Sequence, residues 1–268
     1  MAIGTDLPNF DERWDYDDPG ATELVFRDLL THTEGLADAG YRMELLTQIA
    51  RSQGLQQQFD EAHATLDVVE RQLAEAGILP RVRYLLERGR VFNSSGDAER
   101  AKPLFLEAYE LGRTAGEDFY SIDAAHMLGI VEPGRDGLEW NLRALGAARD
   151  SGDERAGNWQ GSLYNNIGWT YHEIGEYEEA LRYFRLGLEW QRTHDRPKET
   201  RIAQWTVGRC LRSLGRVDEA LELQRENLAA SVETSETDGY IEEEWGSVCS
   251  SKAMPKRRRR ISHARTSC

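Results

Sequence analysis

The chain has 268 residues, of which 40% are hydrophobic and 30% are charged, and its formal net charge is −14. All 47 Asp and Glu residues and 26 of the 33 Lys and Arg residues lie within residues 1–246, so this part carries −21 and the remaining residues carry +7. An acidic body of this kind speaks against a nucleic-acid-binding domain, which presents a basic patch or stripe.

The cysteines and the apolar runs indicate where the protein functions. Cys210, Cys249 and Cys268 have no metal-binding spacing and no pattern of a disulfide framework, which favours a reducing compartment. The first twenty residues lack the apolar core of a signal peptide. No apolar run approaches the roughly 18 residues that a membrane-spanning helix needs. We therefore expect a cytoplasmic protein without membrane contact.

The N-terminal part predicts a cap rather than a full repeat. We expect residues 1–17 to form an extended, acidic and loosely held segment. Asp18 followed by Pro19 is a helix start signal, because a carboxylate caps the first turn and proline suits its first position. The helix that follows carries Phe26 and Leu29 at core spacing. We interpret it as a half-repeat that covers the end of a repeat array.

A small residue then recurs at an even spacing. Its positions are Ala50, Gly89, Gly129, Gly168, Gly208 and Gly246, at intervals of 39, 40, 39, 40 and 38 residues. Apolar residues surround each position at helical spacing, and a second apolar helical stripe follows after a turn. Such helical pairs cannot bury their apolar faces alone, so they stack on one another.

Five helical pairs follow from this spacing. Their first and second helices are predicted at residues 43–53 and 59–73, 82–92 and 98–111, 122–131 and 138–148, 164–171 and 177–188, and 200–213 and 217–230. The repeats lie near residues 43–81, 82–121, 122–160, 161–200 and 201–238, with an incomplete sixth from residue 239. Pro133 and Gly134 end one helix about a turn early. We expect no domain boundary between residues 18 and 246.

Residues 161–188 carry the most specific pattern. Its positions are Tyr164, Ile167, Gly168, Tyr171, Gly175, Tyr177, Ala180 and Phe184. This pattern resembles the tetratricopeptide repeat (TPR), which has an aromatic residue, Leu-Gly, Tyr, Ala and Phe at fixed offsets. The resemblance implies an all-α fold, a right-handed α-α superhelix (TPR solenoid) of about five helical hairpins with a half-repeat at each end.

Motifs of catalysis and cofactor binding are missing from the sequence. There is no phosphate-binding loop, dinucleotide fingerprint, paired CxxC or nucleophile elbow, and His172-Glu173 lacks the second histidine of a metalloprotease helix. Cys210 is predicted on the packed face of its helix, where a buried cysteine is inert. We expect a protein that is not an enzyme and that holds no cofactor or metal.

Surface recognition remains, and the family resemblance indicates where. In TPR proteins the residues at −3, +1 and +4 from the repeat glycine line a concave peptide-binding groove. The candidate groove residues are Arg51, Arg90, Asn93, His126, Asn165, Trp169, His172, Trp205, Arg209 and Arg212. No Asp or Glu occupies any of these positions, although the body is strongly acidic.

The candidate groove residues form a stripe along the first helices, and two interpretations of this stripe stay open. The stripe could bind an acidic or carboxylate-bearing segment, because arginine is a planar bidentate donor and tryptophan a strong anchor. Alternatively, Trp169 and Trp205 fill the gap between neighbouring first helices, and the arginines pair with Asp or Glu of second helices. The lysine-asparagine carboxylate clamp of some family members is not matched. Asn165-Asn166 is similar to the asparagine pair of kinesin light chain repeats.

The resemblance favours a non-catalytic scaffold that binds a protein or peptide, with no nucleic acid and no membrane as partner. A peptide-responsive regulatory or signalling module is the first alternative. An enzyme built on the repeats is the second, and only His126, His172 and Cys210 could supply its chemistry.

The last residues, 247–268, differ from the rest. They include the basic run 256–260, which suggests a nuclear-localisation or polyanion-binding segment, or a disordered tail. A frameshift is the third interpretation, and we favour it. One permitted codon choice, read from the third base of the Gly246 codon, gives ECLFVKGNAEEAKTHFARAYEL, which continues the repeat pattern.

Overall fold

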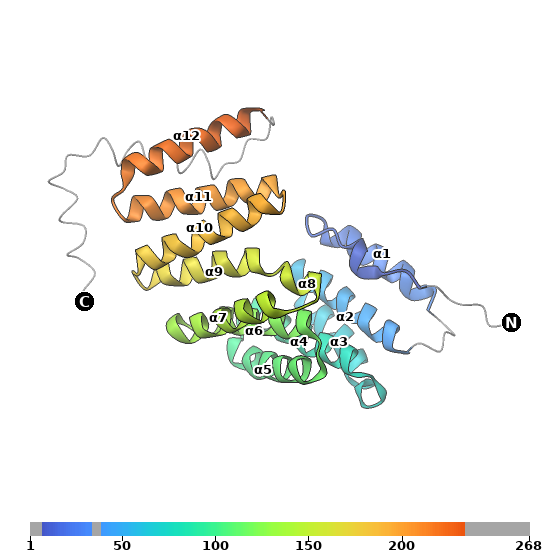
Figure 1. Ribbon diagram of the computed structural model, residues 1–268. Coiled ribbons are helices and arrows are strands. Elements are labelled where there is room, and N and C mark those ends of the chain that lie inside the picture. The colour runs from blue at the N-terminus through green and yellow to red at the C-terminus, as the bar shows by residue number, and fades with distance from the viewer. Residues whose placement is uncertain (1–6, 34–38, 234–268) are drawn as a thin grey trace. The chain divides into compact units, whose positions relative to one another are not determined.

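The computed structural model describes residues 7–33 and 39–233, and among these residues it contains helices and connecting segments but no strand (Figure 1). The chain divides into two compact units between Gly157 and Asn158. We call them unit 1 and unit 2 and describe each by itself. The predicted incomplete sixth repeat and the basic tail lie outside the described residues.

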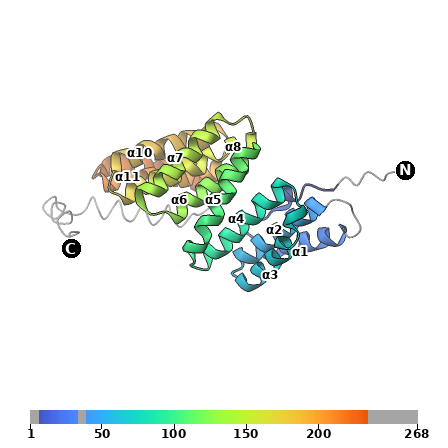
Figure 2. The same cartoon turned by 90° about the horizontal axis from the view of Figure 1, so that it is seen from below.

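Unit 1 holds a single helix, three helical pairs and three short helices. Its elements are η1 (Phe10–Arg13), α1 (Pro19–Thr31), α2 (Ala39–Leu55), α3 (Phe59–Glu70), η2 (Leu73–Glu75), α4 (Ile78–Ser94), α5 (Ala98–Ala115), α6 (Asp118–Val131), α7 (Gly134–Asp150) and α8 (Glu154–Gly157). The pairs are α2 with α3, α4 with α5, and α6 with α7. Figure 2 shows the same helices from below.

Residues 158–233, the described part of unit 2, form two helical pairs. They consist of α9 (Gln160–Glu173) with α10 (Tyr177–Thr193) and of α11 (Pro197–Ser213) with α12 (Val217–Glu233). The described part of the chain therefore contains the five predicted pairs. Most helices start or end a few residues beyond the predicted ranges, because periodicity reports buried positions and the exposed first and last turns add none.

The start of α1 confirms the predicted helix signal. The Oδ1 atom of Asp18 accepts a hydrogen bond from the backbone N–H of Ala21 at 2.9 Å, and Pro19 occupies the first turn. Phe26 is fully buried, and α1 packs against α2. A single helix thus covers the apolar side of the first pair, as a half-repeat does.

The repeat glycines are the points where paired helices meet. A Cβ atom on Gly89 would lie 2.5 Å from the Phe105 ring, and one on Gly168 would lie 2.5 Å from the Phe184 ring. Real Cβ atoms do not approach this closely, so glycine is required at both positions for the ring of the second helix to cover the first helix. The pattern of a glycine followed sixteen residues later by phenylalanine therefore reports helix–helix contact.

The other two pairs with a repeat glycine use different side chains for the same contact. Asn141 covers Gly129, and Gln224 covers Gly208. In the third pair α6 ends at Val131, before Pro133, and α7 begins at Gly134. The turn is therefore shorter, and the covering residue follows its glycine by twelve positions instead of sixteen. This shortening is what Pro133 and Gly134 predict.

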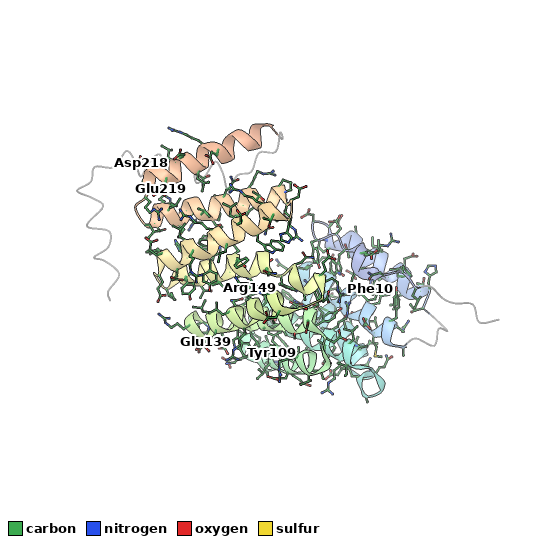
Figure 3. The ribbon with its side chains drawn as sticks, viewed as in Figure 1. Phe10, Tyr109, Glu139, Arg149, Asp218 and Glu219 are labelled. Carbon is green, nitrogen blue, oxygen red and sulfur yellow. The ribbon has the colours of Figure 1, made fainter. Side chains whose placement is uncertain are left out.

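The turns of unit 2 are closed by two glycines in the left-handed region. Gly175 has a φ of 83° and Gly215 a φ of 75°. Residues with a Cβ atom rarely adopt this conformation, so glycine ends both first helices at little steric cost. Asp218 and Glu219, labelled in Figure 3, are exposed residues of the first turn of α12.

Residues 8–16 differ from the expectation of a loosely held segment. Phe10, labelled in Figure 3, is 5% exposed, and its ring packs against Phe26 and Tyr41. The acidic composition suggested a solvated segment, but aromatic residues between the acids anchor it. Within the described residues, no helix combines the length and apolar character needed to cross a membrane.

Candidate functional site

The ten candidate groove residues fall into two groups, one on the first helices of each unit. Unit 1 contributes Arg51 from α2, Arg90 and Asn93 from α4, and His126 from α6. Unit 2 contributes Asn165, Trp169 and His172 from α9, and Trp205, Arg209 and Arg212 from α11. We call these surfaces the first-helix face of unit 1 and the first-helix face of unit 2.

A tryptophan pair forms the centre of the first-helix face of unit 2. The ring centroids of Trp169 and Trp205 are 5.9 Å apart, with 46° between the ring planes. Trp169 also packs its edge against Phe184 of α10 at 5.2 Å. Phe184 is the ring that covers Gly168, so the helix-pair core fixes the position of Trp169. Both indoles remain half-buried and partly open to solvent.

Arg209 lies against both indoles. Its Cζ atom is 5.4 Å from the ring centroid of Trp169 and 5.6 Å from that of Trp205. Attraction between the guanidinium and the ring faces holds the side chain in place. Among the described residues, no carboxylate forms an ion pair with Arg209. The face therefore holds a cation whose position is fixed and whose charge no carboxylate of the described residues neutralises.

His172 borders this arginine. Its Nε2 atom is 2.9 Å from the Oγ atom of Ser213, and its ring packs against Tyr177 at 5.0 Å. Burial, followed by the nearby charge of Arg209, lowers the pKa of His172 below its ordinary value. Arg212 lowers the same pKa, so both arginines act on His172 from α11. The lowered pKa favours the neutral form of the side chain at pH 7.

Asn165 and Arg212 complete this group of residues. Asn165 lies one turn before Trp169 on α9, and its Nδ2 atom donates a hydrogen bond to Oδ1 of Asn166 at 3.4 Å. Arg212 lies one turn after Arg209 on α11. Both side chains are half-buried. The structure thus places all six predicted residues of unit 2 along two neighbouring first helices.

The arginines of unit 1 are paired with acids. Arg51 and Arg90 both donate to Oε1 of Glu87, with N–O distances of 3.2 Å and 2.6 Å. Arg90 also donates to the two carboxylate oxygens of Asp123. Glu87 is 3% exposed and Asp123 is 6% exposed. Burial opposes the charge of Arg90, but Asp123 and Glu87 raise its pKa above the ordinary value. Two cations and two anions form a neutral cluster.

Sequence reasoning missed these acids. The open alternative placed the acidic partners on second helices, but Glu87 and Asp123 belong to the first helices α4 and α6. Neither acid lies at −3, +1 or +4 from a repeat glycine, the three positions that define the candidate groove. Long side chains on a helix lean toward its N-terminus, so they reach neighbours outside their own stripe position. Glu87 three residues before Arg90 is the signal that could have found the cluster.

A pocket of about 210 Å³ opens beside the cluster. It is lined by Arg51, Leu55, Glu87, Arg90, Val91 and Met127, among others. Asn93 is half-buried near the end of α4. His126 is also half-buried, and burial lowers its pKa below the ordinary value. The apolar side chains of this pocket suit an aliphatic group more than a charged one.

The candidate catalytic residues belong to both units. His126 belongs to unit 1, whereas His172 and Cys210 belong to unit 2. Cys210 is fully buried, its Sγ atom donates to the carbonyl oxygen of Tyr177 at 3.3 Å, and burial raises its pKa to about 11. A thiol with that pKa is protonated at pH 7 and is a poor nucleophile.

The contact between His172 and Ser213 also lacks, within the described part of the chain, the third group that a catalytic pair needs. Nucleophilic catalysis by such a pair needs a third group that orients the histidine. Among the described residues, no carboxylate is hydrogen-bonded to Nδ1 of His172. In the same part of the chain, no three His, Cys, Asp or Glu side chains cluster in a way that could hold a metal ion.

Comparison with known proteins now identifies the fold. The sequence profile of the tetratricopeptide repeat matches residues 161–194, which cover α9 from its second residue and all of α10. The comparison with curated proteins finds no match.

Three solved structures illustrate the likeness. The apo form of RapI has a TM-score of 0.73 at 12% identity, over 92% of this chain and 69% of RapI. A signal transduction ATPase with numerous domains from Pyrococcus horikoshii, which has a tetratricopeptide repeat sensor, has a TM-score of 0.72 at 14% identity. This chain is covered to 88% but spans only 38% of that protein. NprR in complex with its cognate peptide NprX has a TM-score of 0.57 at 15% identity, over 96% of this chain and 74% of NprR.

Identities this low establish the fold alone. The predicted all-α helical-repeat fold of the TPR type is confirmed by the helical pairs, by the repeat profile and by these structures.

Proposed function

Because this chain has the fold of tetratricopeptide-like repeat proteins, we propose that it is a non-catalytic interaction scaffold that binds a peptide segment of a partner protein. We assign the binding surface to the first-helix face of unit 2. The ligand that fits this face carries a carboxylate, from Asp, Glu or a chain end, next to an apolar side chain.

The observation that carries this proposal is the position of Arg209 and its lack of an ion pair among the described residues. Its guanidinium lies against two indoles without an ion pair in the described part of the chain. A guanidinium matches a carboxylate with two parallel hydrogen bonds, and burial against aromatic rings strengthens such a pair. A carboxylate-bearing ligand would therefore meet a donor that is already positioned.

The surroundings of Arg209 suit the rest of a peptide. Trp169 and Trp205 offer half-buried ring faces of the kind that anchor interfaces. Asn165 has an amide that can bind a peptide backbone. Arg212 adds a second cation on the same helix. The ligand side chains that pack on the indoles would be apolar or aromatic.

The absence of catalysis is part of the proposal. It is supported by the burial and the raised pKa of Cys210. The acidic body supports a partner that is not a nucleic acid. The cysteine pattern supports a reducing, cytoplasmic setting.

A peptide-responsive regulator is the second candidate. NprR, a structure of the same fold, is bound to its cognate peptide. If this chain works in that way, a short peptide bound at the first-helix face of unit 2 changes the conformation of the chain and thereby the activity of a partner. A scaffold would bind the same peptide without such a change. Small-angle scattering with and without the peptide separates the two candidates.

The test begins with a display library of random dodecapeptides selected on the full-length chain. We expect the selected peptides to be enriched in Asp or Glu beside an aromatic or aliphatic residue. Arg209→Gln and Trp169→Ala should each weaken a selected peptide by about 1–3 kcal/mol, the usual range for the truncation of an anchor residue. Isothermal titration calorimetry measures the change.

Arg182→Gln is the matched control. Arg182 also lies over an aromatic ring in unit 2, at 4.2 Å from the Tyr183 centroid, but it belongs to α10 and pairs with Glu179. It should leave the affinity unchanged. Equal losses for Arg182→Gln and Arg209→Gln, or no loss for either, would reject the first-helix face of unit 2 as the binding surface.

A further inference from the structure

Residues 8–16 contact the first helices α2 and α4 of unit 1, and Arg83 of α4 links them to α6. The hydroxyl of Tyr41 on α2 donates to the carbonyl oxygen of Pro8 at 2.9 Å. Asp11 accepts two hydrogen bonds from Arg83 of α4. Arg83 in turn lies 5.0 Å from the ring of Tyr120 on α6. A short stretch of chain thereby contacts the helices of three successive pairs, directly or through one side chain.

Arg83 is the buried residue at the centre of this contact. Its side chain is 6% exposed, and its Cζ atom is 5.1 Å from the ring centroid of Phe10 and 5.0 Å from that of Tyr120. Its Nε atom is 3.2 Å from Oε2 of Glu44, and its other two nitrogens face Asp11. Asp11 itself is 35% exposed. The helices supply the buried cation, and the N-terminal segment supplies the anion.

Two further aromatic residues of the segment cover Arg51. The rings of Trp14 and Tyr16 stack at 4.8 Å, and the Cζ atom of Arg51 is 5.8 Å and 5.7 Å from their centroids. The indole N–H of Trp14 donates to Oε1 of Gln48 at 3.0 Å. Tyr16 remains 59% exposed. The side chains, rather than a shared strand or helix, hold the segment on the helices.

This mode of contact is that of a bound peptide. Between Pro8 and Tyr16 the segment has one four-residue 3₁₀ helix, η1, and it is anchored by Phe10, Asp11 and Trp14. We propose that the surface formed by Glu44, Gln48, Arg51, Arg83 and Tyr120 is a binding site for a segment of a partner protein. That segment carries an aromatic residue, an acid directly after it, and a second aromatic residue four positions after the first. Residues 7–17 occupy the site until such a partner displaces them.

A partner segment can displace the chain's own segment only by making further contacts. The chain's own segment has the advantage of a high effective concentration, because it is tethered beside the site. A second copy of this chain would bring the same contacts without that advantage, so it gains nothing. A different protein must therefore reach a surface that residues 7–17 leave open.

The pocket of about 210 Å³ is such a surface. Arg51 lines it on one side and lies under Trp14 and Tyr16 on the other. The segment turns away beyond Tyr16, because Oδ1 of Asp15 accepts from the backbone N–H groups of Asp17 and Asp18, and α1 then begins. A partner segment that continues past the second aromatic residue can place an aliphatic side chain among Leu55, Val91 and Met127.

The experiment uses the full-length chain and a fluorescein-labelled synthetic peptide with the sequence of residues 7–17. Phe10→Ala combined with Trp14→Ala releases the internal segment. We expect the probe to bind this double variant at least tenfold more tightly than the unchanged chain, measured by fluorescence anisotropy. A probe with Asp11→Asn should lose at least tenfold on the double variant, and one with Asp17→Leu should gain at least threefold.

Every outcome decides the proposal. Equal binding of the probe to both chains, binding to neither, or no gain from the Asp17→Leu probe would overturn it. Asp11→Arg is a second releasing variant that keeps the apolar anchors, in case the first does not fold. If circular dichroism shows both variants unfolded, residues 7–17 are a structural part of unit 1 and the proposal fails. A dimer of the unchanged chain that the probe converts to monomers would name a second copy as the occupant, and would also overturn it.

Discussion

The two first-helix faces use arginine in opposite ways. In unit 1, Arg51 and Arg90 share the buried carboxylates of Glu87 and Asp123. In unit 2, Arg209 rests on Trp169 and Trp205 and has no ion pair among the described residues. The helical pairs beneath are built alike. The position of an arginine on its helix predicts where it lies, while its neighbours decide whether its charge is paired inside the protein or offered to a ligand.

The largest difference should appear in stability when a charge is removed from each face. Glu87→Gln leaves two arginines beside a single remaining carboxylate in a buried cluster, and it should cost about 3 kcal/mol of unfolding free energy. Arg209→Gln removes only a partly exposed cation from two rings, and it should cost less than about 1 kcal/mol. Urea unfolding followed by circular dichroism measures both. Equal costs would mean that the two faces do not differ in the way described.

Packing below the faces should respond equally in both units. Gly89→Leu in unit 1 and Gly168→Leu in unit 2 each force a side chain against a phenylalanine ring, and each should cost about 1–3 kcal/mol. Gly54→Ala is the control, because its Cβ would meet Val91 at an ordinary 3.6 Å. Thermal unfolding gives the ranking. A large cost in one unit only would show that the units are built differently below the surface as well.

Salt should separate the electrostatic part of recognition from the rest. A carboxylate peptide selected on the full-length chain should bind several-fold more weakly at 0.5 M salt than at 0.05 M, because exposed charge pairs are screened. The same titration with Arg209→Gln should show a smaller salt effect. If the affinity of the unchanged chain is insensitive to salt, Arg209 does not pair with the ligand, and the indoles alone bind it.

The smallest expected effect is the response of unit 2 to acid. The pKa of His172 is lowered in the folded state by burial and by Arg209, so the unfolded chain binds a proton more readily. Stability should therefore fall as the pH drops below the ordinary histidine pKa of about 6.5. His172→Asn should remove part of this acid sensitivity, whereas His32→Asn in unit 1 serves as the control. Unfolding midpoints at pH 7 and pH 5 that shift equally in all three chains would contradict this role of His172.

The sequence was sufficient to predict the repeat fold. Local sequence signals predicted three features that the structure contains. These are the helical pairs at the spacing of the repeat glycines, the start of α1 at Asp18 and the shortened third pair at Pro133. The division between Gly157 and Asn158 left no such trace, because the interval from Gly129 to Gly168 is as regular as the others. Predictions that concern residues 234–268 stay predictions.

The site was predictable only in outline. Helical spacing placed Trp169 and Trp205 on neighbouring helices, and the structure brings their rings together. Helical spacing could not show that Glu87 and Asp123 neutralise the arginines of unit 1. Those ion pairs join side chains from different helix positions and from different repeats. Nor could helical spacing show that Phe10 is buried, because residues 8–16 contain too few apolar residues among the acids to establish a periodicity.

The most direct test of the account asks where a selected peptide binds. A carboxylate peptide from the dodecapeptide selection, with a photoreactive benzoylphenylalanine in place of its aromatic residue, is crosslinked to the full-length chain and mapped by mass spectrometry. The account predicts crosslinks to α9 and α11, around Trp169, Trp205 and Arg209, and their loss in Arg209→Gln. Crosslinks to α9 and α11 that persist in Arg209→Gln, or no crosslink to either of these helices, would contradict it.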